Sequence, residues 1–441
     1  MSQPEPAPCP TPCSNWLTHV RNQEDVSLFD NTGGALQTPS PRQIEALKPQ
    51  IEALHTNQGR IDAAAMTKFL EGLPALKSGS PEELKTLAAK AFGVPSESLG
   101  IRPVWKEGEI GAKGGSGAPV WLVQGSNGGL QGVVKVFPAT QQQLSVMGEE
   151  LHAMQKLNEL HLQQFQSIEV LGAARLPDGA GAIVLSPARG TATDDLMIRL
   201  SKTQAGTPEY QAAMRDLQEA MRANGAALAE LHSMRDGLGM PQAPALDDYI
   251  KAAAEITGKI NDRIYRLPAE DRKMLNLNPV ELQKRVQSLI EGLRRNPGTS
   301  SLTHDDFHPG NVFYDKQAGI TFIDNGRVSQ SLGAGNSMIG SPARDFSHFD
   351  QKLAGFGWEF GMREQDVNAL RQTFRQAYTA NAPALTPESE QFFTARTALG
   401  IFLGALDNQM AKVASSSDSL TFTPEWAAAQ TRMLKKALGL K

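Results

Sequence analysis

The stretch 301–326 constrains the fold of this chain more than any other. Its sequence is SLTHDDFHPGNVFYDKQAGITFIDNG. Two short apolar runs, 311–314 and 320–324, flank a glycine-containing turn, which is the pattern of a β-hairpin. The start of the first strand and the end of the second lie at the same end of an antiparallel pair. We therefore expect Asn311 and Asp324 to face each other at the open end of the hairpin, about 5 Å apart.

Further acidic residues precede this hairpin. Asp306 lies five residues before Asn311, in the loop that leads into the first strand. Like charges held together are costly unless a cation or a reaction needs them. Carboxylate and amide oxygens suit a divalent ion such as Mg²⁺ that holds a nucleotide. A further carboxylate can then deprotonate an attacking hydroxyl. Each residue alone is also common in turns, but their combination favours a site.

The composition is that of an ordinary globular protein. The chain has 441 residues, of which 40% are hydrophobic and 20% charged, enough for two or three domains. A net charge of −4 offers no basic surface for nucleic acid. No apolar run approaches the roughly 18 residues of a membrane span. Cys9 and Cys13 are the only cysteines, which argues against disulfides and for a reducing, cytoplasmic compartment.

Four segments differ in their patterns. Residues 1–40 are rich in Pro and Ser and predict a disordered leader. Residues 41–100 predict a helical extension, 101–190 a small antiparallel sheet with one helix, and 191–441 a helical lobe interrupted by the hairpin. Strands are expected at 119–123, 132–137, 167–171 and 182–186, and the helix at about 141–160. A small β-rich lobe joined to a large helical lobe is a two-lobed α+β plan with a cleft between the lobes.

The hairpin region resembles a known catalytic apparatus. HDDFHPGN, followed by Asp324-Asn325-Gly326, is similar to the catalytic and metal loops of the protein-kinase-like superfamily. The form is closer to aminoglycoside phosphotransferases and choline kinases than to ordinary protein kinases. The resemblance implies a two-lobed kinase fold that uses ATP and Mg²⁺, with Asp306 as the catalytic base and Asn311 and Asp324 as Mg²⁺ ligands.

Neighbouring residues match the family pattern less uniformly. His308 lies where the phosphotransferases often carry a histidine, and we include it among the catalytic candidates. The resemblance implies that His304 is a buried structural residue. Asp305 is an acid where the family usually has another residue, so it is a rival for the base, although its spacing to Asn311 is off by one. Asn325 replaces the usual Phe or Trp.

The resemblance also implies a glycine-rich turn and a strand lysine upstream. The candidate phosphate-binding residues are Gly114, Gly115, Ser116 and Gly117. Glycines there let backbone N–H groups approach a phosphate closely. The first and last glycines of the usual G-x-G-x-x-G pattern are replaced by Lys113 and Ala118, so phosphates could be covered differently.

Lys135 lies inside the second of the expected strands, where an unpaired charge is costly. We expect its partners to be phosphate oxygens and a glutamate, and the kinase pattern pairs it with Glu150 in the helix that follows. The strand at 182–186 leads into the interlobe hinge. There the backbone of Ser186 to Ala188 is expected to bind adenine.

The segment between His232 and His304 bears on the acceptor. In the aminoglycoside and choline kinase branch, helices inserted here build the acceptor pocket. From Asp247 to Arg295 the chain has eight acidic and ten basic residues. A polycationic acceptor would favour an acidic surplus, so the balance argues against an aminoglycoside.

Three functions remain open at this level. The first is an ATP- and Mg²⁺-dependent phosphotransferase acting on a hydroxyl of a small molecule, a lipid head group or a host protein. The second is AMP transfer on the same fold, and the third a non-catalytic nucleotide binder. Retention of Lys135, Asp306, Asn311 and Asp324 argues against the third. The leader lacks the apolar core of a Sec signal; it is either a floppy terminus or the export signal of a bacterial effector secreted into a host cell by another route.

Overall fold

The computed structural model describes residues 48–54, 61–104, 118–166, 168–234, 242–324, 340–414 and 422–440. Several expectations concern residues outside these ranges. They are the leader with Cys9 and Cys13, the phosphate-binding candidates Gly114, Gly115, Ser116 and Gly117, and the pair Asn325 and Gly326.

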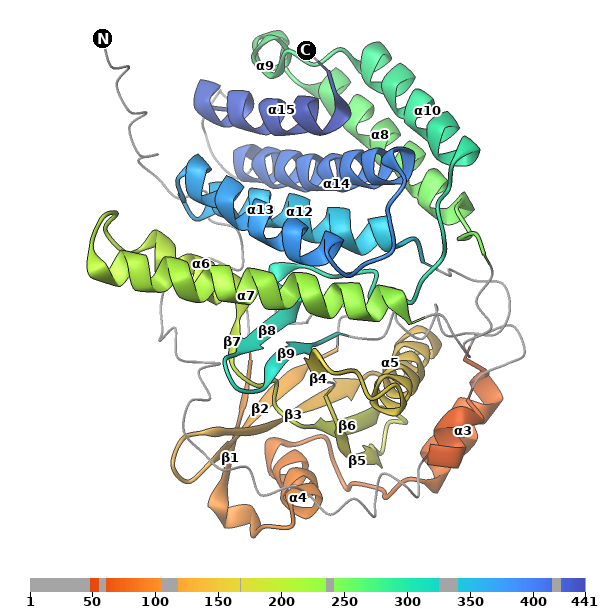
Figure 1. Ribbon diagram of the computed structural model, residues 1–441. Helices are drawn as coiled ribbons and strands as arrows, with labels where there is room; N and C mark the ends of the chain where they lie inside the picture. The colour runs from red at the N-terminus through yellow and green to blue at the C-terminus, as the bar shows by residue number, and fades with distance from the viewer. Residues whose placement is uncertain are drawn as a thin grey trace.

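A five-stranded sheet in the order β1-β2-β3-β6-β5 forms the smaller lobe, in the lower half of Figure 1. Its strands are β1 Leu99–Pro103, β2 Val120–Gly125, β3 Leu130–Phe137, β5 Val170–Arg175 and β6 Gly181–Leu185. Every neighbouring pair is antiparallel. The helix expected after β3 is α5, Gln141–Glu159. The two-lobed α+β plan is therefore confirmed.

Two strand expectations need correction. β1 was not expected, and the strand expected at 167–171 is β5, three residues further along. β5 has the sequence VLGAAR, and glycine and alanine are depleted in strands. Its side chains are nevertheless almost all buried. Small residues fit there because helix α4, Pro81–Phe92, packs against this strand: Ala91 lies 3.2 Å from where a Cβ on Gly172 would be.

Helices cover both faces of this sheet. Helix α3, Ala63–Gly72, joins α5 on one face through a cluster that contains Phe69, Leu70 and Phe137. Helix α4 packs on the other face with Leu84 and Val134 in its cluster. Each helix begins at a side-chain cap, Asp62 for α3 and Ser80 for α4.

The hairpin belongs to a second sheet in the order β4-β9-β8-β7. Its strands are β4 Phe165–Gln166, β7 Thr191–Ala192, β8 Val312–Asp315 and β9 Gly319–Phe322. In Figure 1 it lies between the larger sheet and the long helix α7. β7 can approach β8 because Gly190 has φ +85° and a Cβ there would lie 2.1 Å from the carbonyl oxygen of Tyr314.

The open end of the hairpin differs from the expected register by one residue. Asn311 ends a 3₁₀ turn, Pro309–Asn311, and Asp324 lies two residues beyond β9 with φ +57°. The backbone carbonyl of Asn311 accepts from the N–H of Ile323 at 3.0 Å, so Asn311 faces Ile323 and not Asp324. The turn sets this register, because Asp315 pairs with Gly319, and the apolar pattern alone did not fix which residues pair there.

The larger lobe is helical. Its helices are α6 Thr193–Ser201, α7 Pro208–Ser233, α8 Asp247–Arg266, α9 Ala269–Leu275, α10 Pro279–Arg295, α12 Pro342–Glu359, α13 Glu364–Thr379, α14 Pro387–Ala414 and α15 Pro424–Leu438. One apolar cluster joins α6, α7, α12 and α13 to the hairpin, and a second joins α8, α10, α14 and α15. Within the described ranges, no helix is both long and apolar enough to cross a membrane.

Candidate active site

Lys135 lies in the middle of β3 and is 6% exposed. Side chains alternate along a strand, so Lys135 shares a face with Val133 and Phe137, the face that α5 covers. Its Nζ donates to both carboxylate oxygens of Glu150, at 2.8 and 3.0 Å. Glu150 is itself 3% exposed. The ion pair expected from the sequence is therefore present.

The Lys135 ammonium also reaches the hairpin of the other lobe. Nζ donates to Oδ1 of Asp324 at 3.0 Å, and the Asp324 side chain is 51% exposed. Burial alone would lower the pKa of Lys135, but the carboxylates of Asp324 and Glu150 outweigh it and raise that pKa. The same ammonium lowers the pKa of Asp324. Both groups are consequently charged at neutral pH.

Asp306 and Asn311 lie together in the loop before the hairpin. The Asn311 side-chain amide donates to the backbone carbonyl of Asp306 at 3.1 Å and reaches its Oδ2 at 3.5 Å. The Nδ1 of His304 accepts from the N–H of Asp306 at 3.3 Å, and its Nε2 donates to the carbonyl of Ile323 at 2.9 Å. This fully buried imidazole thus links the Asp306 loop to the strand that leads to Asp324.

A second buried carboxylate holds the same loop from the helical lobe. Asp345, at the start of α12, accepts from the backbone N–H groups of His304 at 2.6 Å and Asp305 at 2.7 Å. His232 contacts Asp345 at 3.3 Å and the hydroxyl of Tyr378 at 2.8 Å. His232 is fully buried, as expected for a core residue.

Asp305, the rival for the base, is occupied elsewhere. Its φ is +63°, it is 4% exposed, and its Oδ1 lies 3.2 Å from Nε of Arg344. The hydroxyl of Tyr249, from α8, donates to the same oxygen at 3.2 Å. The Asp306 side chain, by contrast, is 41% exposed. Of the two neighbouring acids, Asp306 is the one available to a substrate.

The comparisons with known proteins agree with this geometry. A model of the phosphotransferase enzyme family matches residues 110–390, more than half of the chain. The chain belongs to the phosphotransferase enzyme family. This confirms the resemblance inferred from the catalytic loop. In a separate comparison, no curated protein sequence matches the chain.

Solved structures similar to this phosphotransferase are distant from it in sequence. A thermostable mutant of aminoglycoside phosphotransferase APH(4)-Ia has 12% identity and a TM-score of 0.46, over 80% of this chain and 98% of that one. A glucosamine kinase in complex with glucosamine, ADP and inorganic phosphate has 13% identity and a TM-score of 0.48, over 82% and 83%. Choline kinase from Cryptosporidium parvum has 11% identity and a TM-score of 0.43, over 81% and 95%.

We call the open end of the hairpin, with Asp306, Asn311 and Asp324, the hairpin mouth. Its side-chain oxygens are suitable ligands for a hard cation. The Asn311 amide nitrogen is used by Asp306, which leaves the side-chain carbonyl oxygen as a ligand. Asp324 uses Oδ1 for Lys135 and has Oδ2 available. Among the residues described, no group of three His, Cys, Asp or Glu side chains could hold a metal by itself. An amide and a carboxylate suit Mg²⁺, which takes few protein ligands and keeps water and phosphate oxygens.

The remaining predicted site residues have structural partners of their own. His308 caps the 3₁₀ turn, where its Nδ1 accepts from the N–H of Gly310 at 3.1 Å, and burial lowers its pKa. The N–H of Ser186 already donates to the carbonyl of Glu169 at 2.9 Å, so this donor cannot also bind adenine. Ala188 packs against the apolar cluster of the smaller lobe, and its contact with adenine stays a prediction.

Sequence reasoning missed His348 and Lys352, two residues beside Asp306. Arg344, His348 and Lys352 follow each other at intervals of four in α12 and therefore share one helix face. The Nε2 of His348 lies 3.9 Å from Oδ1 of Asp306. Burial lowers the pKa of Lys352, and the nearby Asp306 carboxylate acts against this. The spacing in the sequence is a signal that could have identified this face of the phosphotransferase.

Proposed function

We propose that this phosphotransferase transfers the γ-phosphate of ATP, with Mg²⁺, to a hydroxyl group. The observation that carries the proposal is the buried Lys135 ammonium, which bridges Glu150 of the smaller lobe and Asp324 of the hairpin. A lysine in the middle of an apolar strand is costly unless its charge is paired. Its position between the lobes supports a role in holding phosphate oxygens.

The residues around Asp306 support its role as the general base. The Asn311 amide and the His304 imidazole fix the loop on both sides of Asp306, while its carboxylate stays accessible. In the proposed reaction, the acceptor hydroxyl oxygen attacks the γ-phosphorus while an Asp306 oxygen takes the hydroxyl proton. The bond from that phosphorus to the bridging oxygen breaks, and ADP leaves. Asn311 and Asp324 would hold Mg²⁺, which when bound supplies positive charge to the triphosphate.

The hydrogen bonds between Lys135 and Glu150 also fix the direction of the Lys135 ammonium. With Glu150 accepting two of its hydrogen bonds, the ammonium is fixed in direction and its charge is kept by the raised pKa. A fixed donor aimed at a phosphate stabilises charge that develops during transfer without having to reorganise. This supports Lys135 as a phosphate-binding residue and not only a structural one.

The decisive experiment measures ATP binding by titration calorimetry and ADP formation, each with and without Mg²⁺. Asp324→Asn should lose the Mg²⁺-dependent gain in ATP affinity, by about 10- to 100-fold. Asp315→Asn is the matched control, because Asp315 caps the turn at the closed end of the same hairpin. Unchanged Mg²⁺ dependence in Asp324→Asn would contradict the proposal. Mass spectrometry of the modified acceptor distinguishes phosphate transfer from AMP transfer.

A further inference from the structure

The face of α12 that borders Asp306 is basic. Arg344, His348 and Lys352 lie on it one turn apart, and α12 contacts the 3₁₀ turn that begins the hairpin. Arg344 is committed to Asp305 through its Nε and through Nη2, which donates to the Asp305 carbonyl at 2.8 Å. Lys352 and His348 are not committed in this way.

His348 carries a hydrogen-bond donor that has no acceptor in the described part of the chain. Arg344 Nη1 donates to its Nδ1, and a guanidinium can only donate, so the proton of the neutral imidazole is on Nε2. Burial and the adjacent Arg344 lower the pKa of His348 well below its usual value, which keeps the ring neutral. His348 is 7% exposed, and its Nε2 has no hydrogen-bond partner among the residues described. At 3.9 Å, Asp306 is too far to accept.

Lys352 is a half-buried cation at the same place. Its Nζ lies 5.9 Å from the centre of the Phe356 ring, which also contacts His308, and the His308 and His348 rings are 5.9 Å apart. Its ammonium makes no hydrogen bond or ion pair within the described part of the chain. Through space, the carboxylates of Asp306 and Glu359 raise its pKa, whereas burial and the Arg344 guanidinium lower it. A cation in this position lacks a close anionic partner.

We propose that the acceptor carries an anionic group, a carboxylate or a phosphate, beside the hydroxyl that is phosphorylated, and that Lys352 binds this group. The inference rests on the proposed function, because it places the acceptor next to Asp306. Lys352 would neutralise the anion and limit its repulsion from the Asp306 carboxylate, and the Nε2–H of His348 supplies a further donor. A cationic acceptor would instead be repelled by the Lys352 ammonium.

The test compares acceptors that are derived from glucose and differ in charge. Glucose, glucosamine, gluconate and glucose 6-phosphate are each added to the enzyme with ATP and Mg²⁺, and ADP and phosphorylated product are measured. We expect gluconate or glucose 6-phosphate to stimulate ADP formation above glucose, and glucosamine not to. The two anions separate a carboxylate site from a phosphate site. A preference for glucose or glucosamine would overturn the proposal. So would an equal rate of ADP formation with all four compounds, or no ADP formation with any of them.

Substitution of Lys352 gives an independent readout. For the stimulating anion, Lys352→Gln should raise the acceptor KM by about 10- to 100-fold, the value of a charged hydrogen bond. Lys352→Arg keeps the charge and should recover most of that loss. Lys316→Gln is the control for net charge, because Lys316 is an exposed residue at the turn of the hairpin, paired with Asp216. An unchanged acceptor KM in Lys352→Gln would refute the assignment.

The two proposals fail in different ways. If the wild-type enzyme forms no ADP and binds no ATP, the proposed function is wrong. If it binds ATP in an Mg²⁺-dependent manner that Asp324→Asn abolishes, but shows no preference for anionic acceptors, only the present inference is wrong.

Discussion

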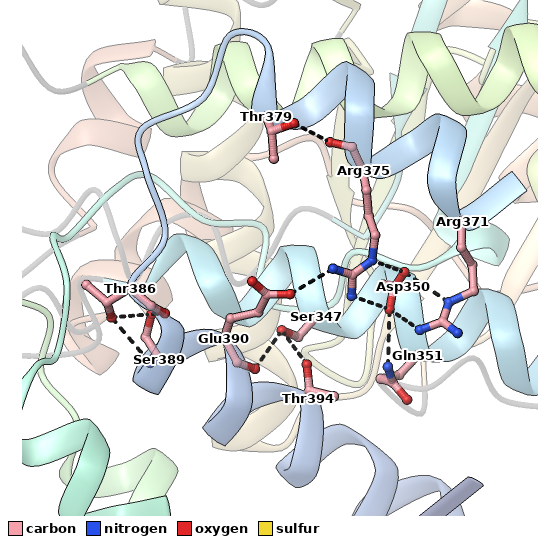
Figure 2. Close-up of polar contacts among 10 residues, drawn as sticks. All are labelled: Ser347, Asp350, Gln351, Arg371, Arg375, Thr379, Thr386, Ser389, Glu390 and Thr394. Carbon is pink, nitrogen blue, oxygen red and sulfur yellow. Dashed lines mark hydrogen bonds and ion pairs between the residues drawn. The ribbon is translucent and has the colours of Figure 1, made fainter. Parts of the chain in front are cut away.

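Two clusters of charged side chains, one at the hairpin mouth and one between α12 and α13, differ in how completely their carboxylates are paired. In the second cluster, the carboxylate of Asp350 is fully buried and accepts four hydrogen bonds from Arg371 and Arg375, between 2.5 and 3.0 Å. Figure 2 shows the two guanidinium groups on either side of this carboxylate. Gln351 adds a fifth donor at 3.2 Å.

In the second cluster, Arg375 also has partners other than Asp350. Arg375 Nη1 donates to Glu390 at 2.8 Å, and its guanidinium lies 5.0 Å over the Phe346 ring. At the hairpin mouth, Asp324 and Asp306 keep oxygens exposed to solvent. A buried charge that is fully paired stabilises a packing arrangement, whereas oxygens left available between two lobes can bind a ligand. The comparison predicts that substitutions at the mouth reduce activity and that substitutions at Asp350 reduce stability.

The largest expected effect is on catalysis. Asp306→Asn should lower kcat by about 10²- to 10⁴-fold, the range for loss of a general base. The fold should be kept, because the carboxylate makes no buried ion pair and the backbone contacts of the loop do not depend on it. ADP formation in the presence of acceptor and the thermal midpoint are measured together. A wild-type rate, or a collapse of the fold, would remove the distinction between the two clusters.

In the second cluster, Asp350→Asn should lower the free energy of unfolding by about 3–5 kcal/mol, because two guanidinium groups lose their shared anion. Urea unfolding followed by circular dichroism measures the loss, and the kcat of the remaining folded enzyme should stay near that of the wild type. An active-site role for Asp350 would appear instead as a lower kcat with unchanged unfolding.

The pH dependence of that loss follows from the Asp350 pKa. Burial would raise this pKa, but Arg375 and Arg371 outweigh burial and lower it below the ordinary 3.8. A depressed pKa contributes stability that is complete above about pH 4 and is lost as the pH falls through the lower folded value. The difference in stability between wild type and Asp350→Asn should therefore stay roughly at its neutral value from about pH 5 to pH 8 and shrink only in stronger acid.

The next prediction separates charge from packing at Lys135. Lys135→Met should lower kcat by about 10²- to 10³-fold, as for loss of a fixed electrostatic donor. It should also cost stability, because Glu150 stays buried without its partner. Burial already raises the pKa of Glu150, so it would take up a proton. The double variant Lys135→Met, Glu150→Gln should recover stability but not activity. Recovery of both would mean that the ion pair is only structural.

The pairing of Lys135 with Glu150 was expected from the kinase pattern, and two regular periods support it. Alternation along β3 points Lys135 to the face covered by α5, and Glu150 borders the apolar face of that helix. The hairpin was predictable for the same reason. Its open end was not, because the register depends on the turn. Asp315 pairs with Gly319, which places Ile323 and not Asp324 opposite Asn311.

Contacts between distant segments were also beyond sequence reasoning. Nothing local indicates that Asp305 is taken up by Arg344, 39 residues later, or that Asp350 meets Arg371. By residue type alone, both acids are candidate site residues. Only their arginine partners in the folded protein show that their carboxylates are already paired. The bounds of β5 were misplaced by three residues for a different reason, since its alanines and glycine fit under α4 against their intrinsic preference.

The smallest expected effect tests whether the Asp350 cluster is saturated. Gln351 donates to Asp350 Oδ2, but that oxygen already accepts from Arg371 Nη2 and Arg375 Nη2. Gln351→Ala should therefore cost less than about 1 kcal/mol, below an ordinary hydrogen bond, with no change in kcat. Arg371→Gln, which removes two donors, is the comparison in the same urea experiment. An equal loss in both variants would show that the two arginines do not satisfy Asp350, and the cluster would then have to be regarded as open, like the hairpin mouth.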